Sequence, residues 1–274
     1  MEEQVLVTAS GISTHCHMGG RGNPVVLLHG SGPGVSAWAN WSGVAPRLAG
    51  RYRVIAPDMA GFGKSRSPDG GPNIKVWVRQ LIELLDALDI ERASVIGNSF
   101  GGGLALAAVL RHPERFDRLI LMGTPAGTFP QPEGLKAGMN FVLTLESMEQ
   151  ALKRLAYDPA IVTPEMVRAR YAAALEQDGV EAFRRLMPPP PPEGETAMVR
   201  GVPEESLRTI KHETLVLHGR EDRVVPPECG LLLNRCIPHS QLHLFGCCGH
   251  WVHLEQETRF MQLVEAFLAE AAKP

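Results

Sequence analysis

Short apolar runs of four to six residues recur along the chain, and each run ends in turn residues. Valine, isoleucine and leucine dominate most of them. Such continuous runs are typical of strands that are buried on both faces of a sheet. The predicted strands span residues 25–29, 52–56, 93–97, 119–122, 214–218 and 241–245.

Apolar residues at three- and four-residue spacing lie between most of these runs. One such pattern spans residues 77–88, a second spans 104–110 and a third spans 260–268. This spacing predicts helices that bury one face against the sheet. Strands that alternate with helices predict the α/β class, with a mostly parallel, doubly wound sheet.

The alternation breaks between residues 127 and 207, where no strand-like run occurs. Helical patterns cover 141–157, 164–176 and 179–186, and five consecutive prolines at 188–192 favour an extended polyproline connector. Strand–helix alternation then resumes at Thr214. We therefore predict one α/β core made of residues 1–126 and 208–274, with residues 127–207 inserted as a helical lid. An independent second domain fits less well, because the core needs both flanks to complete its sheet.

Length and composition agree with a globular protein. The 274 residues correspond to one large domain or one domain with an insertion, and 44% of them are hydrophobic, which is enough to bury a core. The 27 basic and 30 acidic side chains nearly balance, so nothing in the charge favours nucleic acid or an anionic membrane as a partner. The longest apolar runs, of about six residues, are far shorter than the roughly 20 that span a bilayer.

The N-terminus and the cysteines predict a cytoplasmic location. The first residues, Met-Glu-Glu-Gln, contain no apolar signal segment. The five cysteines are odd in number and include the adjacent pair Cys247 and Cys248, which does not suggest a disulfide framework. No C-x-x-C spacing indicates zinc. We expect neither a metal nor a cofactor.

The strongest chemical motif is Gly-Asn-Ser-Phe-Gly at residues 97–101, which follows a predicted strand and precedes a predicted helix. A G-x-S-x-G in this context is a nucleophile elbow, and it predicts Ser99 as the nucleophile. The backbone N–H of Phe100, at the helix N-terminus, can then stabilise an oxyanion. The alternative, a glycine-rich turn without chemistry, fits less well because the motif stands between a strand and a helix.

A serine hydroxyl needs a base that is oriented by an acid. In this architecture the acid and then the histidine follow the serine along the chain. Asp222 follows the predicted strand 214–218, and His250 follows the last predicted strand. Glu221 is the alternative acid, and a solvated loop acid is the plain interpretation of either residue. The other histidines considered are His218, His239, His243 and His253.

Residues 29–34, His-Gly-Ser-Gly-Pro-Gly, follow the first predicted strand. Glycines let the backbone approach a ligand closely, so the amide of Ser31 or Gly32 is predicted to be the second oxyanion donor. A phosphate-binding loop is excluded, because no lysine followed by serine or threonine stands at the required spacing.

Three other patterns are interpreted as structural. Residues 58–65 end in Gly-Lys-Ser, but Asp58 occupies the position of the first P-loop glycine, so the segment is read as a tight turn after a strand. The pair His15 and His17, on an early strand around Cys16, hints at a metal site, but no third ligand is evident in the sequence. The spacing of His250 and His253 is a weak metal signal for the same reason.

Taken together, these motifs resemble the α/β-hydrolase superfamily over nearly the whole chain. Within it, residues 29–41, 97–102, 212–222 and 248–251 are similar to the meta-cleavage product hydrolases, above all to the 2-hydroxymuconic semialdehyde hydrolases. Those enzymes cleave a carbon–carbon bond in the dienol-carboxylates that ring fission of catechols produces. The resemblance implies a small-molecule substrate of that kind, a homo-oligomer, and Ser99, Asp222 and His250 as the triad.

The resemblance also implies substrate contacts. Asn40 and Asn98 match polar residues at the 2-hydroxy-carboxylate end of the substrate. Arg170 matches an arginine of the lid that binds the carboxylate, and its neighbour Arg168 falls on a different face of the helix. Trp251 matches an aromatic residue of the same subsite, and Cys248 matches a residue beside it. Where aryl-specific relatives carry a bulky aromatic residue, this chain has Leu-Ala at 155–156.

Two other functions remain alternatives from the sequence. A carboxylesterase on the same scaffold would carry an identical triad, so Arg170, Asn40 and Trp251 discriminate between the two enzymes. A binding module that has retained the triad but lost turnover is the other alternative. The sequence leaves open whether Ser99 forms an acyl-enzyme or activates water.

Overall fold

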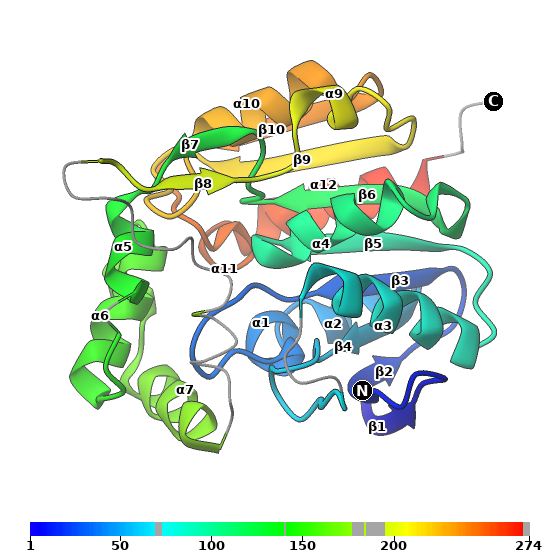
Figure 1. Ribbon diagram of the computed structural model, residues 1–274, viewed down its shortest axis with the longest axis horizontal. Helices are drawn as coiled ribbons and strands as arrows, with labels where there is room; N and C mark the ends of the chain where they lie inside the picture. The colour runs from blue at the N-terminus through cyan, green and yellow to red at the C-terminus, as the bar shows by residue number, and fades with distance from the viewer. Residues whose placement is uncertain (69–72, 140, 177–183, 185–194, 271–274) are drawn as a thin grey trace.

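In the computed structural model, residues 1–68, 73–139, 141–176, 184 and 195–270 are described. Within them, eight strands form one sheet: β1 (Glu2–Val7), β2 (Ser13–Gly19), β3 (Pro24–Leu28), β4 (Arg53–Pro57), β5 (Ala93–Asn98), β6 (Phe116–Met122), β9 (Glu213–Gly219) and β10 (Ser240–Phe245). Their order is β1-β2-β4-β3-β5-β6-β9-β10 (Figure 1). The six strands from β4 to β10 pair in parallel, whereas β1 and β2 pair antiparallel at one edge.

The six runs predicted as strands all lie in this parallel part, which confirms the predicted fold class. The N-terminal hairpin was not predicted as a pair of strands from its pattern. Five of the six residues of β1 are exposed, including Val5 and Val7, so the strand carries no buried face for a hydrophobic pattern to report.

Helices cover both faces of the sheet. Alternate residues of β3 show this, because Val26 and Leu28 pack in one core cluster while Val25 and Leu27 pack in another. The first cluster contains residues of α3 (Ile74–Ala87), α4 (Phe100–Val109), α9 (Glu204–Leu207) and α10 (Pro227–Cys236). The second contains residues of α1 (Ala37–Trp41), α2 (Ala45–Leu48), α11 (Val252–Glu255) and α12 (Glu257–Ala269).

The segment between β6 and β9 contains α5 (Glu133–Met139), α6 (Leu145–Leu155) and α7 (Pro164–Glu176), which stand beyond one end of the sheet (Figure 1). It also contains β7 (Thr128–Pro130) and β8 (Met198–Arg200), which pair antiparallel. The prediction that residues 127–207 contain no strand was therefore wrong. Each of these strands has three residues and its partner is distant along the chain, so no periodic pattern could reveal them.

The two remaining short helices are 3-10 turns, η1 (Pro113–Arg115) and η2 (Pro159–Ile161). Helix α7 has the predicted bounds, whereas α6 is shorter than the predicted 141–157 because Thr144 caps it by accepting a hydrogen bond from the Ser147 amide. The predicted proline connector at 188–192 lies outside the described residues, as does the predicted helix at 179–186 apart from residue 184.

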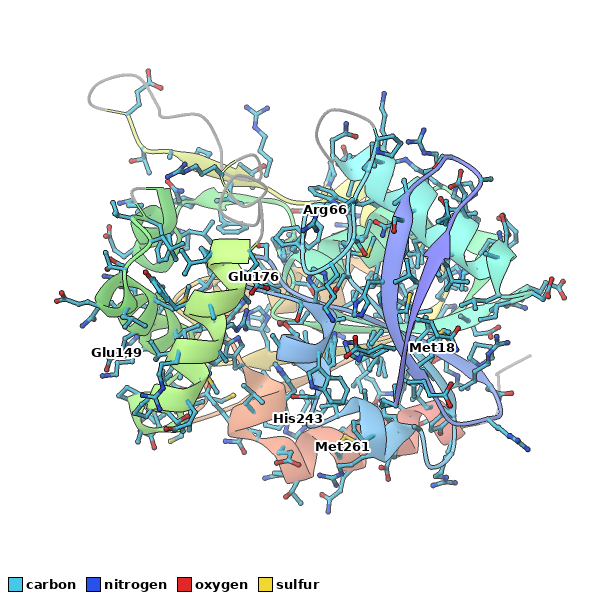
Figure 2. All side chains as sticks on the ribbon, turned by 90° about the horizontal axis from the view of Figure 1, so that it is seen from below. Met18, Arg66, Glu149, Glu176, His243 and Met261 are labelled. Carbon is cyan, nitrogen blue, oxygen red and sulfur yellow. The ribbon has the colours of Figure 1, made fainter. Side chains whose placement is uncertain are left out.

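Helices α6 and α7 share a small apolar core of their own, which includes Met148, Leu152 and Val167. Trp251 joins this core from the other part of the chain, next to α11. Seen from below, Glu149 of α6 and Glu176 of α7 lie on the opposite side of the molecule from Met18 in β2 (Figure 2).

Among the described residues, no helix combines the length and apolarity that crossing a bilayer requires.

Candidate active site

Ser99 lies between β5 and α4 in a strained turn. Its φ of 55° and ψ of −114° are rare for a residue with a side chain, and its N–H donates a hydrogen bond of 2.8 Å to the carbonyl of Met122. The turn brings Gly97 against the backbone of Gly101 and Gly102, where any Cβ would collide. The two glycines of the motif are therefore required by close backbone approach, as the elbow interpretation predicts.

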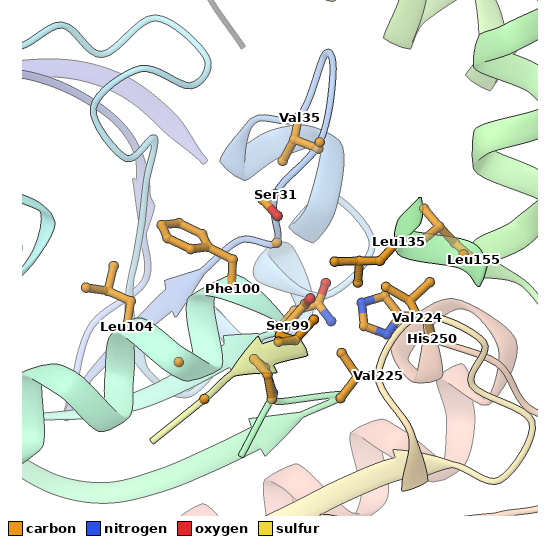
Figure 3. A pocket seen from close by; sticks show the side chains of 18 of the residues that line it. Ser31, Val35, Ser99, Phe100, Leu104, Leu135, Leu155, Val224, Val225 and His250 are labelled. Carbon is orange, nitrogen blue, oxygen red and sulfur yellow. The ribbon is translucent and has the colours of Figure 1, made fainter. Parts of the chain in front are cut away.

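The oxyanion candidates lie around Ser99. Phe100 is the first residue of α4, so its N–H has no acceptor within the helix. Ser31 and Gly32 line the same cavity from the loop after β3 (Figure 3). The two segments predicted to supply the oxyanion donors therefore border the same cavity as Ser99.

His29 holds the loop that carries Ser31. Its Nε2 accepts a hydrogen bond of 2.9 Å from the Met59 N–H, which leaves the proton on Nδ1. Nδ1 donates to the carbonyl of Gly30 over 2.6 Å. In a trans peptide the N–H points opposite to the C=O, so this bond also fixes the direction of the Ser31 N–H. His29 is buried, and burial lowers its pKa, which keeps the ring neutral.

The predicted acid and base are in contact. His250 Nδ1 donates to Asp222 Oδ2 over 2.7 Å, and this bond leaves Nε2 as the proton acceptor for a serine hydroxyl. Asp222 Oδ1 accepts the N–H groups of Val224 and Val225 at 2.8 and 2.9 Å. Although burial opposes ionisation, His250 and His218 hold the pKa of Asp222 well below its usual range.

Glu221, the alternative acid, points elsewhere. Its Oε2 accepts the Cys248 N–H over 3.1 Å, and its Oε1 pairs with Arg220 at the surface. Among the other histidines considered, His218 lies 3.4 Å from Asp222 and does not line the cavity. His239 and His243 do not line the cavity.

The loop that carries His250 is fastened to the lid. The N–H of His250 donates to the carbonyl of Leu155, the last residue of α6, over 2.7 Å. Glu255 then connects the same two segments, because its carboxylate accepts the N–H of Gly249 and the N–H of Tyr157. The base is therefore positioned by the lid as well as by Asp222.

A cavity of about 990 Å³ lies between the lid and the sheet. Ser99 and His250 face it side by side in Figure 3, with Leu135, Leu155, Val224 and Val225 around them. Four of the substrate contacts predicted from the sequence line this cavity: Asn40, Asn98, Arg170 and Trp251. The cavity thus combines a nucleophile, an apolar wall and a small polar group of residues.

Arg170 is the charged residue that stands out in this lining. It is 7% exposed, and its Nη1 is buried with no hydrogen-bond partner. Burial lowers the pKa of Arg170 to about 10, so the guanidinium remains charged at neutral pH. Arg168, two residues before Arg170, is exposed and pairs with Glu165, so it is not a candidate for the cation of the cavity. A buried cation with an unpartnered nitrogen is suited to binding an anion.

The two asparagines have different surroundings. Asn40 Oδ1 accepts the Gly30 N–H over 3.1 Å, and its Nδ2 is buried without a partner. Asn98 Nδ2 makes a long bond of 3.5 Å to the Met122 carbonyl. His253 holds the backbone of Asn40, because its Nε2 lies 2.9 Å from the backbone carbonyl of Asn40. Burial lowers the pKa of His253 to about 3. A neutral His253 donates this bond.

Cys248 departs from the expected placement. Its side chain is fully buried in the core cluster with α12, and it does not line the cavity. The thiol lies 3.7 Å from the Gly249 carbonyl, and burial raises its pKa. Cys248 therefore packs in the core instead of lining the cavity.

Comparison with known proteins shows which family has this fold and sequence. Residues 23–257 match the model of the alpha/beta hydrolase fold family. A 2-hydroxy-6-oxo-2,4-heptadienoate hydrolase from Pseudomonas putida is 46% identical over 96% of this chain and 95% of its own. A 2-hydroxymuconate semialdehyde hydrolase from a Pseudomonas species is 46% identical over 97% of this chain and 93% of its own.

The chain belongs to the meta-cleavage product hydrolases, a branch of the α/β hydrolase family. A solved meta-cleavage product hydrolase from Pseudomonas fluorescens, a serine-to-alanine variant with bound acetate, superposes with a TM-score of 0.89 at 44% identity over 97% of both chains. The family predicted from the sequence motifs is thereby confirmed.

Three residues of this meta-cleavage product hydrolase site gave no usable signal in the sequence. Glu255 is one of several acidic residues in its segment, and His253 stood out only through a metal-like spacing. His29 was noted as part of a glycine-rich loop and not for its own hydrogen bonds. Each acts on a backbone group, and such contacts leave no pattern of residue types.

Proposed function

We propose that this protein hydrolyses the carbon–carbon bond of 2-hydroxy-6-oxohexa-2,4-dienoates, which are the ring-fission products of catechols. The observation that carries the proposal is Arg170, a buried guanidinium with an unpartnered nitrogen in the cavity of Ser99 and His250. A simple ester substrate carries no anion for a fixed cation to bind. A dienoate substrate carries a terminal carboxylate that Arg170 can bind. The names of the relatives support the same substrate class.

The chemistry accounts for these residues. A carbon leaving group departs only if its electrons are delocalised, so the dienol must first ketonise, taking a proton at C5 as the 2-hydroxyl loses one. Arg170 binds the carboxylate, and Asn40 Nδ2, buried without a partner, is available to the 2-oxygen. The C6 ketone then lies beside Ser99, with the amides of Ser31 and Phe100 at its oxygen.

Bond cleavage then follows from attack at C6. His250 takes the proton of the attacking hydroxyl and is stabilised as a cation by Asp222. The C5–C6 bond breaks, and its electrons pass through C3–C4 into the 2-oxo group, which regains a proton. The products are 2-hydroxypenta-2,4-dienoate and a carboxylic acid. Both attack by Ser99 with an acyl-enzyme and attack by activated water lead to these products.

The test is a spectrophotometric assay with the coloured ring-fission products of catechol, 3-methylcatechol and 2,3-dihydroxybiphenyl. Hydrolysis bleaches these dienolates, so the protein is expected to bleach at least one of them while Ser99→Ala does not. p-Nitrophenyl esters are assayed in parallel. Rapid ester turnover without bleaching of any dienolate would overturn the proposal in favour of a carboxylesterase.

Two further properties belong to this proposal. A cytoplasmic location agrees with the five cysteines, all of which are free thiols. A homo-oligomer agrees with a sheet that ends in a hairpin strand at one edge and in β10 at the other. Light scattering after size-exclusion chromatography measures the oligomeric state directly, and a monomer at assay concentration contradicts this second property.

A further inference from the structure

A cluster of metal-ligand side chains lies outside the active site, on the N-terminal hairpin. In the register of β1 and β2, Glu3 stands opposite His17 and Val5 opposite His15. Because side chains alternate along a strand and opposite residues share a face, Glu3, His15 and His17 project from one face of the hairpin. One ligand atom of each lies within 4.8 Å of the other two.

The surroundings of His15 orient it as a ligand. Its Nδ1 lies 2.9 Å from Asp58 Oδ2, and a carboxylate can only accept, so Nδ1 donates. Asp58 is itself held by the N–H groups of Ala37 and Lys64. The other nitrogen, Nε2, lies 3.0 Å from Glu3 Oε2 and donates to it when no metal is bound, so an ion that binds there displaces this proton. A carboxylate behind one imidazole nitrogen is the arrangement that fixes metal-binding histidines in proteins.

The spacing suits a small divalent ion. With bonds of about 2.0–2.1 Å, two ligand atoms of a tetrahedral zinc site lie roughly 3.4 Å apart. His15 and His17 are buried, and His17 stacks on Trp38 with ring centroids 4.6 Å apart, so both rings are held in place. Glu3 is 55% exposed, so its carboxylate can change rotamer when an ion binds.

Lys64 places a positive charge beside Glu3 when no metal ion is bound. Its Nζ lies 2.9 Å from Glu3 Oε2, and its side chain is 69% exposed. An exposed lysine pair contributes little to stability, so the ammonium can move into solvent when a metal ion binds. The second oxygen of Glu3 also remains available to it.

We infer that Glu3, His15 and His17 form a binding site for a divalent transition-metal ion of the zinc type, with Asp58 as the carboxylate that orients His15. Two imidazoles and one carboxylate favour Zn²⁺, Co²⁺, Ni²⁺ or Cu²⁺ over Mg²⁺ and Ca²⁺, and water completes the coordination. The bound ion ties β1 to β2. None of the three ligands lines the catalytic cavity, so the site stabilises the hairpin and takes no part in the hydrolysis.

The test uses the full chain without an affinity tag, titrated with Co²⁺ and with Zn²⁺. Calorimetry is expected to show one ion per chain, and the Co²⁺ complex is expected to absorb without a thiolate charge-transfer band. Glu3→Gln and His17→Phe should each weaken binding at least tenfold. His239→Ala, which removes an exposed histidine outside the cluster, should leave binding unchanged.

Folding does not confound these variants. Glu3 is largely exposed, and phenylalanine at position 17 keeps an aromatic ring on Trp38. Saturating Zn²⁺ should raise the Tm of the unsubstituted protein and not that of Glu3→Gln, because a ligand that binds only the folded state stabilises it. The inference is overturned if Glu3→Gln and His17→Phe bind the ion as tightly as the unsubstituted protein does. A thiolate band that places the ion at a cysteine, or no binding by the unsubstituted protein, also overturns it.

Discussion

The carboxylate of Glu255 accepts a hydrogen bond of 2.9 Å from the N–H of Gly249, the residue before the catalytic base. Its other oxygen accepts the N–H of Tyr157, just after α6, over 2.6 Å. One side chain thus fastens the base-carrying loop to the lid. The His250 N–H also donates to Leu155, so the position of the base depends on that of α6.

Glu255→Gln should therefore reduce turnover without removing any group that touches the substrate. The amide keeps one acceptor but presents an N–H to a backbone N–H, so we expect kcat to fall about tenfold and the free energy of unfolding to fall by about 1–3 kcal/mol. Steady-state bleaching and urea unfolding measure the two effects. Glu257→Gln, an exposed carboxylate two residues further on, is the matched control and should change neither.

Asp222 gives a pH dependence with a definite sign. Its pKa is lower in the folded protein than the value of about 3.9 in an unfolded chain, so the folded state holds fewer protons at low pH. The resulting stability is complete above about pH 4 and is lost as the pH falls through the folded pKa. Urea unfolding between pH 2 and 7 should show the unfolding free energy falling below about pH 4, and Asp222→Asn should show a smaller slope of this free energy against pH. Parallel slopes for the two proteins would contradict the role of this carboxylate.

Arg170 is expected to trade stability for function. Arg170→Met removes a buried cation with an unpartnered nitrogen, so the unfolding free energy of the free protein should rise by about 1–3 kcal/mol. Bleaching of dienolates should collapse because ketonisation loses its carboxylate clamp, while p-nitrophenyl ester hydrolysis should persist. Arg168→Met, on the exposed side of the same helix, serves as control. Equal loss of both activities in Arg170→Met would argue against the clamp.

His29 is predicted to act as a positioning residue through the Gly30 carbonyl. His29→Ala should lower kcat on the order of 10²-fold for dienolates and esters alike, with little change in KM, because the Ser31 amide loses its fixed direction. His29→Asn can place a donor where Nδ1 stands and should recover part of the loss, whereas His29→Gln should not. Similar kcat values for the Asn and Gln variants would show that the bond to Gly30 is not what matters.

The sequence by itself determined the parallel sheet and the order of the catalytic groups. Runs such as 93–97 are apolar on both faces, which only a doubly covered sheet accommodates, and Gly97 and Gly101 mark a turn where two backbones meet closely. These features are local, since each is encoded within about ten residues. The family could be predicted for the same reason, because its motifs lie in such short segments.

Tertiary structure decided the contacts between distant segments. The pairing of β7 with β8, the attachment of Glu255 to the lid and the inward direction of Cys248 depend on residues that are far apart along the chain and on backbone groups that every residue carries. The sequence showed His15 and His17 without a third ligand, and only the register of β1 on β2 brings Glu3 to them. Local pattern fixes an element and its buried face, whereas the partner across a strand or a loop is fixed by the folded packing.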